Sequence, residues 1–180
     1  MDQIATWKPG QPVPRLTTQS SRDEWAATAK ELFENKKFSQ AVFAFERAGL
    51  SRQRDVAQAY HLRELARQQS TSGSQQVEAF REAARAFCSA AEATNKTREA
   101  KVYFRICAEC YVRAGDHDNA GKFYERASEY TLSAKNYRVG GCFDDAVRLA
   151  KTHEQEIEPS VRENVVEISK LYYLKSGALT

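Results

Sequence analysis

The arrangement in the sequence that most resembles a reactive site is the cysteine pair Cys107 and Cys110. A C-x-x-C motif can carry redox chemistry at the exposed start of a helix, or it can supply half of a zinc site. Here the pair falls in the middle of a helical pattern from Tyr103 to Arg113, and no second C-x-x-C or paired histidine follows it. We therefore interpret both cysteines as packed thiols and expect no metal ion and no cofactor.

The histidines and glycines offer no catalytic signature either. His61, His117 and His153 are scattered, and His117 lies in a Gly-Asp-His-Asp stretch that is typical of a turn between helices. The adjacent glycines at 140–141 are not followed by Lys-Ser or Lys-Thr, so they do not form a phosphate-binding loop. We expect no catalytic residue and interpret the segment as a non-enzyme.

The composition narrows the class of protein and its partners. Hydrophobic residues make up 42% of the 180, which is enough to build a packed core. The longest apolar run is 41–45, far short of the roughly 20 residues that a membrane span needs. Lys plus Arg number 27 against 24 acids, and the two signs are interleaved, so the charge permits nucleic-acid contact without arguing for it. With no signal peptide and four cysteines only, we expect an intracellular protein, cytoplasmic or nuclear, without a membrane partner.

The elements that would position these residues are predicted to be helices. Three of the four prolines lie in the first fourteen residues, so residues 1–21 are predicted to be an extended lead-in. From 22 onward apolar residues recur at spacings of three and four, and no useful stretch alternates with period two. The sequence therefore predicts an all-α fold with helices near 22–36, 38–49, 52–69, 74–94, 97–114, 117–128, 130–140, 142–152 and 159–177.

An internal repeat organises these helices. The pattern from Trp25 to Ala48, a small residue facing a large one in two successive helices, recurs at 104–127 and again at 130–150. Small residues let the paired helices approach, and aromatic side chains fill the groove between them. The third copy has short helices and lacks the aromatic residue of the second helix, where Ala150 stands. The expected packing residues are Trp25, Ala29, Ala41, Phe45, Ala108, Tyr111, Ala120, Tyr124, Ala134, Tyr137 and Ala146.

The first two copies resemble tetratricopeptide (TPR) repeats, whose pattern is W-x2-L-G-x2-Y followed by A-x3-F. The resemblance implies an irregular, right-handed TPR-like α-solenoid of about nine antiparallel helices over residues 22–180. Its repeat-like pairs are expected near 22–49, 52–94, 97–128 and 130–152, with a final helix at 159–177. The pair at 52–94 is longer and fits no TPR register well.

Two blocks of sequence narrow this resemblance. One comprises 24–33, 41–49 and 59–62, and the other comprises 108–116 and 140–147. Together they resemble the helical region of large, mainly fungal proteins related to the TPR- and ankyrin-repeat-containing protein, in which a UvrD/Rep-type helicase-like region precedes the helices. The resemblance covers roughly residues 10–180 and implies that the chain is a piece of a longer protein with its ATPase elsewhere. The apolar end 171–180, which has no polar capping helix, leads to the same expectation.

Basic side chains provide the candidate contacts for a partner. Residues 98, 101 and 105 fall on one face of the fifth predicted helix, and such helices line the concave surface of TPR arrays. The candidate partner-binding row is Arg98, Lys101, Arg105, Glu109 and Arg113. A second group, Arg52, Arg54, Arg63 and Arg67, could contact phosphate or an acidic peptide, but a solvated helix face explains it more simply.

Two functions remain open at this stage. The first is a non-catalytic interaction module that binds a protein, a peptide or other domains of its parent chain along an extended groove. The alternative is an accessory region of a UvrD/Rep-type ATP-dependent helicase that contacts nucleic acid. Salt dependence distinguishes them, because phosphate contacts make affinity fall steeply as salt rises.

Overall fold

The structure, a computed structural model, describes residues 16–17, 20–68 and 73–177. Within these ranges the chain is all-helical, with nine α-helices and no strand. The all-α prediction and the number of helices are confirmed, and each helix begins and ends within two residues of its predicted bounds. The helices are α1 (Arg22–Glu34), α2 (Phe38–Arg47), α3 (Ser51–Gln68), α4 (Ser74–Ala93), α5 (Thr97–Arg113), α6 (His117–Arg126), α7 (Tyr130–Val139), α8 (Phe143–Thr152) and α9 (Pro159–Lys175).

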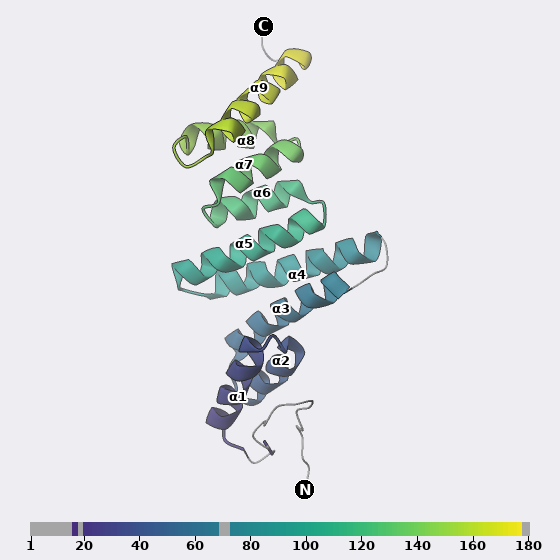
Figure 1. The fold of residues 1–180 in the computed structure, drawn as a ribbon, viewed down its shortest axis with the longest axis vertical. Coiled ribbons are helices and arrows are strands. Elements are labelled where there is room, and N and C mark those ends of the chain that lie inside the picture. Colours follow the sequence, from purple (N-terminus) through teal and green to yellow (C-terminus); the bar gives the residue numbers. More distant parts are fainter. Residues whose placement is uncertain (1–15, 18–19, 69–72, 178–180) are drawn as a thin grey trace.

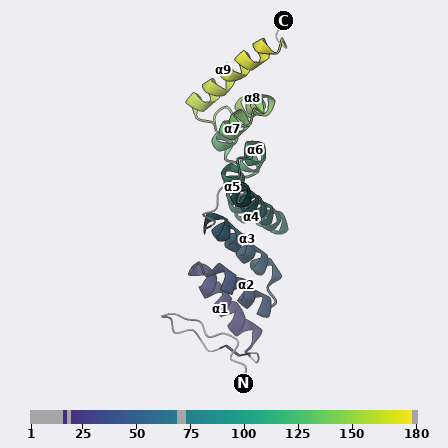
Figure 2. The same cartoon turned by 90° about the vertical axis from the view of Figure 1, so that its right-hand side faces the viewer.

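The nine helices form a tall stack in sequence order, with α1 at one end and α9 at the other (Figures 1 and 2). Each helix packs against the next one along the chain, and α9 also reaches back to α7. The buried side chains accordingly fall into successive clusters, one around α1 and α2, one across α3 to α5, one at α5 and α6, and one from α7 to α9. The core is a series of interfaces between neighbouring helices, so no single centre holds the chain together.

One turn recurs between the short helices. Each time, a residue with positive φ follows the helix, and the N–H after it bonds to the carbonyl five residues back, at 2.8–2.9 Å. This is the Schellman motif, which satisfies carbonyls left free at a helix end. The turns recur at a constant interval within each run, because a ten-residue helix is followed each time by three turn residues. The positive-φ residues are Lys36 and Gly49 in the first run, and Gly115, Ser128 and Gly141 in the second.

The predicted packing residues lie in the helix interfaces. The alanines among them are completely buried, and the large side chains are buried as well, apart from the partly buried Tyr111. One close approach lies outside the predicted set. Gly121 on α6 lies against the ring of Tyr137 on α7, where a Cβ atom would come within 2.6–2.9 Å of the ring carbons. The buried Ser133 hydroxyl donates to the Gly121 carbonyl at 2.8 Å and holds the two helices together.

The start of the helical region is capped. Ser21 and Glu24 form a reciprocal capping box at the first turn of α1, which satisfies two backbone N–H groups. Leu16 is buried against Trp25 and Ala29. Most of the predicted lead-in, 1–15 and 18–19 with Trp7 included, lies outside the described residues.

The longest helices occupy the middle of the stack. α3 has 18 residues and α4 has 20, whereas α6, α7 and α8 have ten each. α4 buries an apolar stripe that includes Phe80, Ala84 and Phe87 against α3 and α5. These two long helices, α3 and α4, form part of the wall of the pocket described below.

Candidate functional site

The cysteine pair lies inside the core. Cys107 and Cys110 are 0% and 2% exposed and belong to the middle of α5. Burial raises the pKa of Cys110 to about 11 and raises that of Cys107 further still. Since a reactive thiol needs a lowered pKa and access to solvent, neither side chain has the properties of a redox or nucleophilic centre.

Two of the three histidines, His117 and His153, have structural neighbours. His117 pairs through Nδ1 with the Asn136 amide oxygen at 2.9 Å, and His153 stacks on the Tyr130 ring with centroids 3.6 Å apart. In the described part of the chain, no group of three or more His, Cys, Asp or Glu side chains could hold a metal ion.

The row predicted on α5 faces solvent. Arg105 is tied to acids on both sides, with Nε 3.4 Å from Glu109 and Nη1 3.6 Å from Glu129. Arg98, Lys101 and Arg113 are exposed and have no ion pair among residues 20–68 and 73–177. Within the described ranges, the row therefore offers three cations without an ion pair and one neutralised pair.

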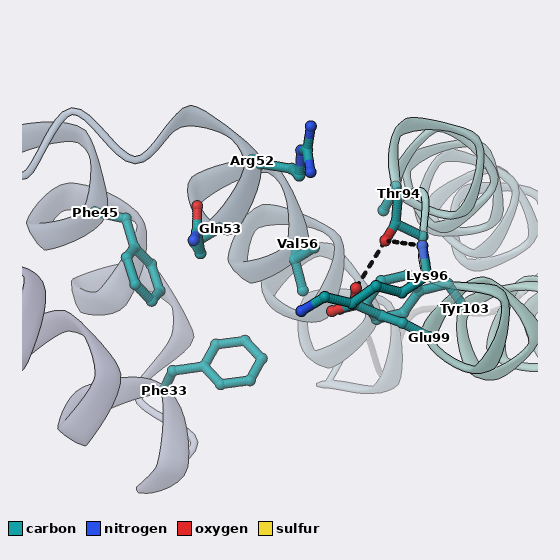
Figure 3. Close-up of a pocket in the computed structure, with 10 residues that line it drawn as sticks. Phe33, Phe45, Arg52, Gln53, Val56, Thr94, Lys96, Glu99 and Tyr103 are labelled. Carbon is teal, nitrogen blue, oxygen red and sulfur yellow. Dashed lines mark hydrogen bonds between the residues drawn. The ribbon is translucent and has the colours of Figure 1, made fainter.

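A pocket lies beside this row, where α1, α2 and α3 meet the turn between α4 and α5. Its volume is about 280 Å³. Figure 3 shows Phe33 and Phe45 on one side of it and Tyr103 on the other, with Val56 of α3 between them. Ala90 of α4 adds to this lining, so a large part of the pocket wall is apolar.

An aromatic cluster holds the apolar wall in place. Tyr60 of α3 contacts three rings, with centroids 5.2 Å from Phe33, 5.1 Å from Phe38 and 5.0 Å from Phe87. Edge-to-face and stacked pairs of this kind contribute beyond simple burial. The cluster joins α1, α2, α3 and α4, so the pocket is formed by helices that the core already fixes.

The polar side of the pocket is built around Glu99. Thr94 donates to its carboxylate at 2.7 Å and the Tyr103 hydroxyl donates at 3.1 Å (Figure 3). The hydrogen bond from Thr94, supported by the one from Tyr103 and by the charges of Lys96 and Arg52, lowers the pKa of Glu99. Glu99 is therefore ionised at neutral pH, and each of its carboxylate oxygens accepts one hydrogen bond from within the protein.

Two cations complete the rim. Arg52 of α3 and Lys96 before α5 both line the pocket, and neither has a carboxylate at ion-pair distance in the described ranges. Glu99 offsets part of their charge without contacting either of them closely. The pocket can therefore hold an apolar side chain next to a negatively charged group.

Sequence reasoning found this site only in part. Phe45 was expected as a packing residue, and Arg52 belonged to a group interpreted as a solvated helix face. No motif or spacing in the sequence marks Lys96 or Glu99. No periodic pattern within one helix marks the pocket, because its wall comes from five segments of the chain.

No helix in the described residues is both long and apolar enough to cross a membrane. Comparison with protein-family models, with curated proteins and with solved structures gives no match.

Proposed function

We propose that this segment is a non-catalytic protein-interaction module, an irregular right-handed TPR-like α-solenoid that takes a partner peptide at the pocket between α1–α3 and the start of α5. Neighbour-by-neighbour packing and the turn that recurs at a constant interval support the repeat interpretation. The buried small residues at matching places in three helix pairs support it too.

The pocket is the observation that carries the proposal. It combines an apolar wall with two rim cations, Arg52 and Lys96, that lack acidic partners of their own within the described ranges. A peptide that inserts a leucine-sized side chain next to an Asp or Glu would bury apolar surface at roughly 25 cal/mol per Å² and neutralise the rim. The chemistry of the occupant is thus an apolar anchor adjacent to a carboxylate.

We also propose, on the resemblance described above, that the module belongs to a larger helicase-like protein. In that setting the peptide could come from another chain or from elsewhere in the parent protein. Contact with nucleic acid is the competing function, and the salt dependence of the affinity distinguishes it from peptide binding.

An NMR titration tests the proposal. The probe is a short blocked peptide of glycine and serine that carries one adjacent Glu-Leu pair. We expect shift changes confined to residues around the pocket and weak, saturable binding. The double variant Arg52→Glu/Lys96→Glu should weaken binding fivefold or more by reversing two rim charges, on the order of 1 kcal/mol. Lys151→Glu on the distant α8, also an exposed lysine, is the matched control and should bind as the parent protein does.

Any of three results would contradict the proposal. The first is shift changes scattered over the surface, and the second is an affinity that the rim variant leaves unchanged. The third is an oligothymidylate strand that binds more tightly than the peptide, with an affinity that falls steeply between low and moderate salt.

A further inference from the structure

The face of α3 that forms part of the pocket continues past it. Arg52, Val56, Tyr60, Arg63 and Arg67 are separated by steps of four, four, three and four residues. Such steps place all five side chains on one face of a helix. These five residues form a stripe along α3, which begins with the cation Arg52 at the pocket, passes the aromatic cluster at Tyr60 and ends with the two cations Arg63 and Arg67.

Arg63 makes cation–π contacts with aromatic rings, and no acidic side chain forms an ion pair with it in the described part of the chain. Its guanidinium carbon lies 4.9 Å from the centroid of Tyr60 and 5.7 Å from that of Phe87. The side chain is half-buried, and its Nε is fully buried without a hydrogen-bond partner among the described residues. A guanidinium that is oriented by aromatic rings and lacks a counter-ion is prepared to bind an external carboxylate.

The same end of α3 faces α5. Burial raises the pKa of Cys110 on α5, and the nearby positive charges of Arg63 and Arg67 act in the opposite direction. Arg67 is bound to Glu64 at 2.9 Å, so Arg63 is the cation at this end without a carboxylate of its own in the described ranges. At the other end, Arg52 acts in the same way on Glu99, also of α5. Both cations thus act electrostatically on groups of α5.

We propose that Arg63 is a second acid-binding position, and that the partner is a peptide with two carboxylate groups, one on each side of its apolar anchor. This inference rests on the proposed function. Arg63 follows Arg52 by eleven residues, which at 1.5 Å per residue separates their Cα atoms by about 16 Å. An extended peptide advances about 3.3 Å per residue, so its two acidic residues should be about five positions apart.

The charges along the groove favour discrete acids over a continuous anion. Glu64 binds Arg67 at 2.9 Å, and Glu99 lines the pocket together with Arg52. A nucleic-acid backbone presents phosphates at every step and would meet these carboxylates. A peptide with neutral residues between two acids places its negative charges only at the two ends, near Arg52 and Arg63.

Three related peptides test the inference. The first is the single Glu-Leu probe, the second adds another Glu about five residues from the first, and the third places that second Glu about two residues closer. We expect the second peptide to bind about threefold to fivefold more tightly than the first, which is the contribution of a partly exposed ion pair. The third peptide should show a smaller increase in affinity over the first. Arg63→Gln should remove the gain and leave the affinity for the first peptide unchanged.

Arg54→Gln is the matched control, because Arg54 lies on the opposite side of α3 and pairs with Asp55 at 2.8 Å. The Arg54→Gln variant should still bind the second peptide more tightly than the first. Replacing the second Glu of the peptide with Gln tests the same contact without altering the protein, should Arg63→Gln fail to fold. If the first peptide binds at the pocket but the second Glu adds nothing, or adds the same at every spacing, this inference is wrong and the proposed function stands. If no peptide binds, the proposed function itself fails.

Discussion

Replacing Gly121 with alanine should destabilise the protein, although alanine is the better helix former. A Cβ at this position would lie 2.6 Å from Cδ1, 2.8 Å from Cε1 and 2.9 Å from Cγ of Tyr137. Ordinary contacts of a Cβ are 3.4 Å or longer. The ring cannot swing away freely, because Tyr137 is 2% exposed and its hydroxyl bonds to Glu125 at 3.2 Å.

The magnitude follows from two opposing effects. Gly→Ala inside a helix gains up to about 1 kcal/mol, whereas forcing extra volume into a packed core costs about 1–3 kcal/mol. The Ser133–Gly121 hydrogen bond of 2.8 Å resists the separation of α6 from α7 that would relieve the overlap. We expect a net loss of about 1–2 kcal/mol, and therefore a melting temperature lower by about 2–8 °C for a chain of this size.

Thermal and urea unfolding, monitored by circular dichroism, measure this change in stability. The control is the same substitution made together with Tyr137→Ala, where the overlap is gone. In that background Gly121→Ala should stabilise the protein relative to Tyr137→Ala alone, so the effect changes sign. A raised melting temperature for the single Gly121→Ala variant would falsify the reasoning, and so would a loss of equal size in both backgrounds.

Two further predictions concern titratable groups. Cys107 and Cys110 should resist a thiol reagent in the native protein at pH 8 and react once the protein is unfolded, because both are buried with raised pKa values. Labelling with the reagent and then mass spectrometry measures this. Rapid labelling of either cysteine in the native protein would contradict the prediction. The hydrogen bonds from Arg148 lower the pKa of Glu125 below its ordinary 4.5. Its ionised form thus stabilises the fold fully above about pH 5, and the advantage over Glu125→Gln in urea unfolding should disappear as the pH falls through that lowered pKa. A constant difference between pH 3 and pH 7 would show that Glu125 contributes nothing through its charge.

The positions of the helices could be predicted because their signals are local. Glycines at 49, 115 and 141 end helices, and all three have the positive φ that a Schellman turn requires. The short interval between the second and third repeat copies, which appeared irregular for a TPR, corresponds to two units of a ten-residue helix and a three-residue turn. Lys36 and Ser128 take the same positive-φ position without being glycine, so composition alone did not reveal how regular the turns are.

The candidate site was harder to predict because it depends on which helices meet. Residues 98, 101 and 105 of α5 are exposed, but only the structure shows Arg105 bound to Glu129 from the turn that follows α6. Likewise, Glu99 acquires its role through Thr94, which belongs to the end of another helix. The need for glycine at 121 also arises from a ring on a neighbouring helix, and no spacing rule within α6 indicates it.

The repeated turn has a consequence for how such a chain can change in length. A ten-residue helix and its three-residue turn form a unit of constant length. When two such units are duplicated or lost, the residues that become neighbours in the chain occupy equivalent positions in their units. Deleting 117–142, for instance, would bring Ala146 to the place beside α5 that Ala120 now fills. Gene rearrangement could therefore lengthen or shorten this end of the protein while the pocket between α1 and α5 keeps its shape.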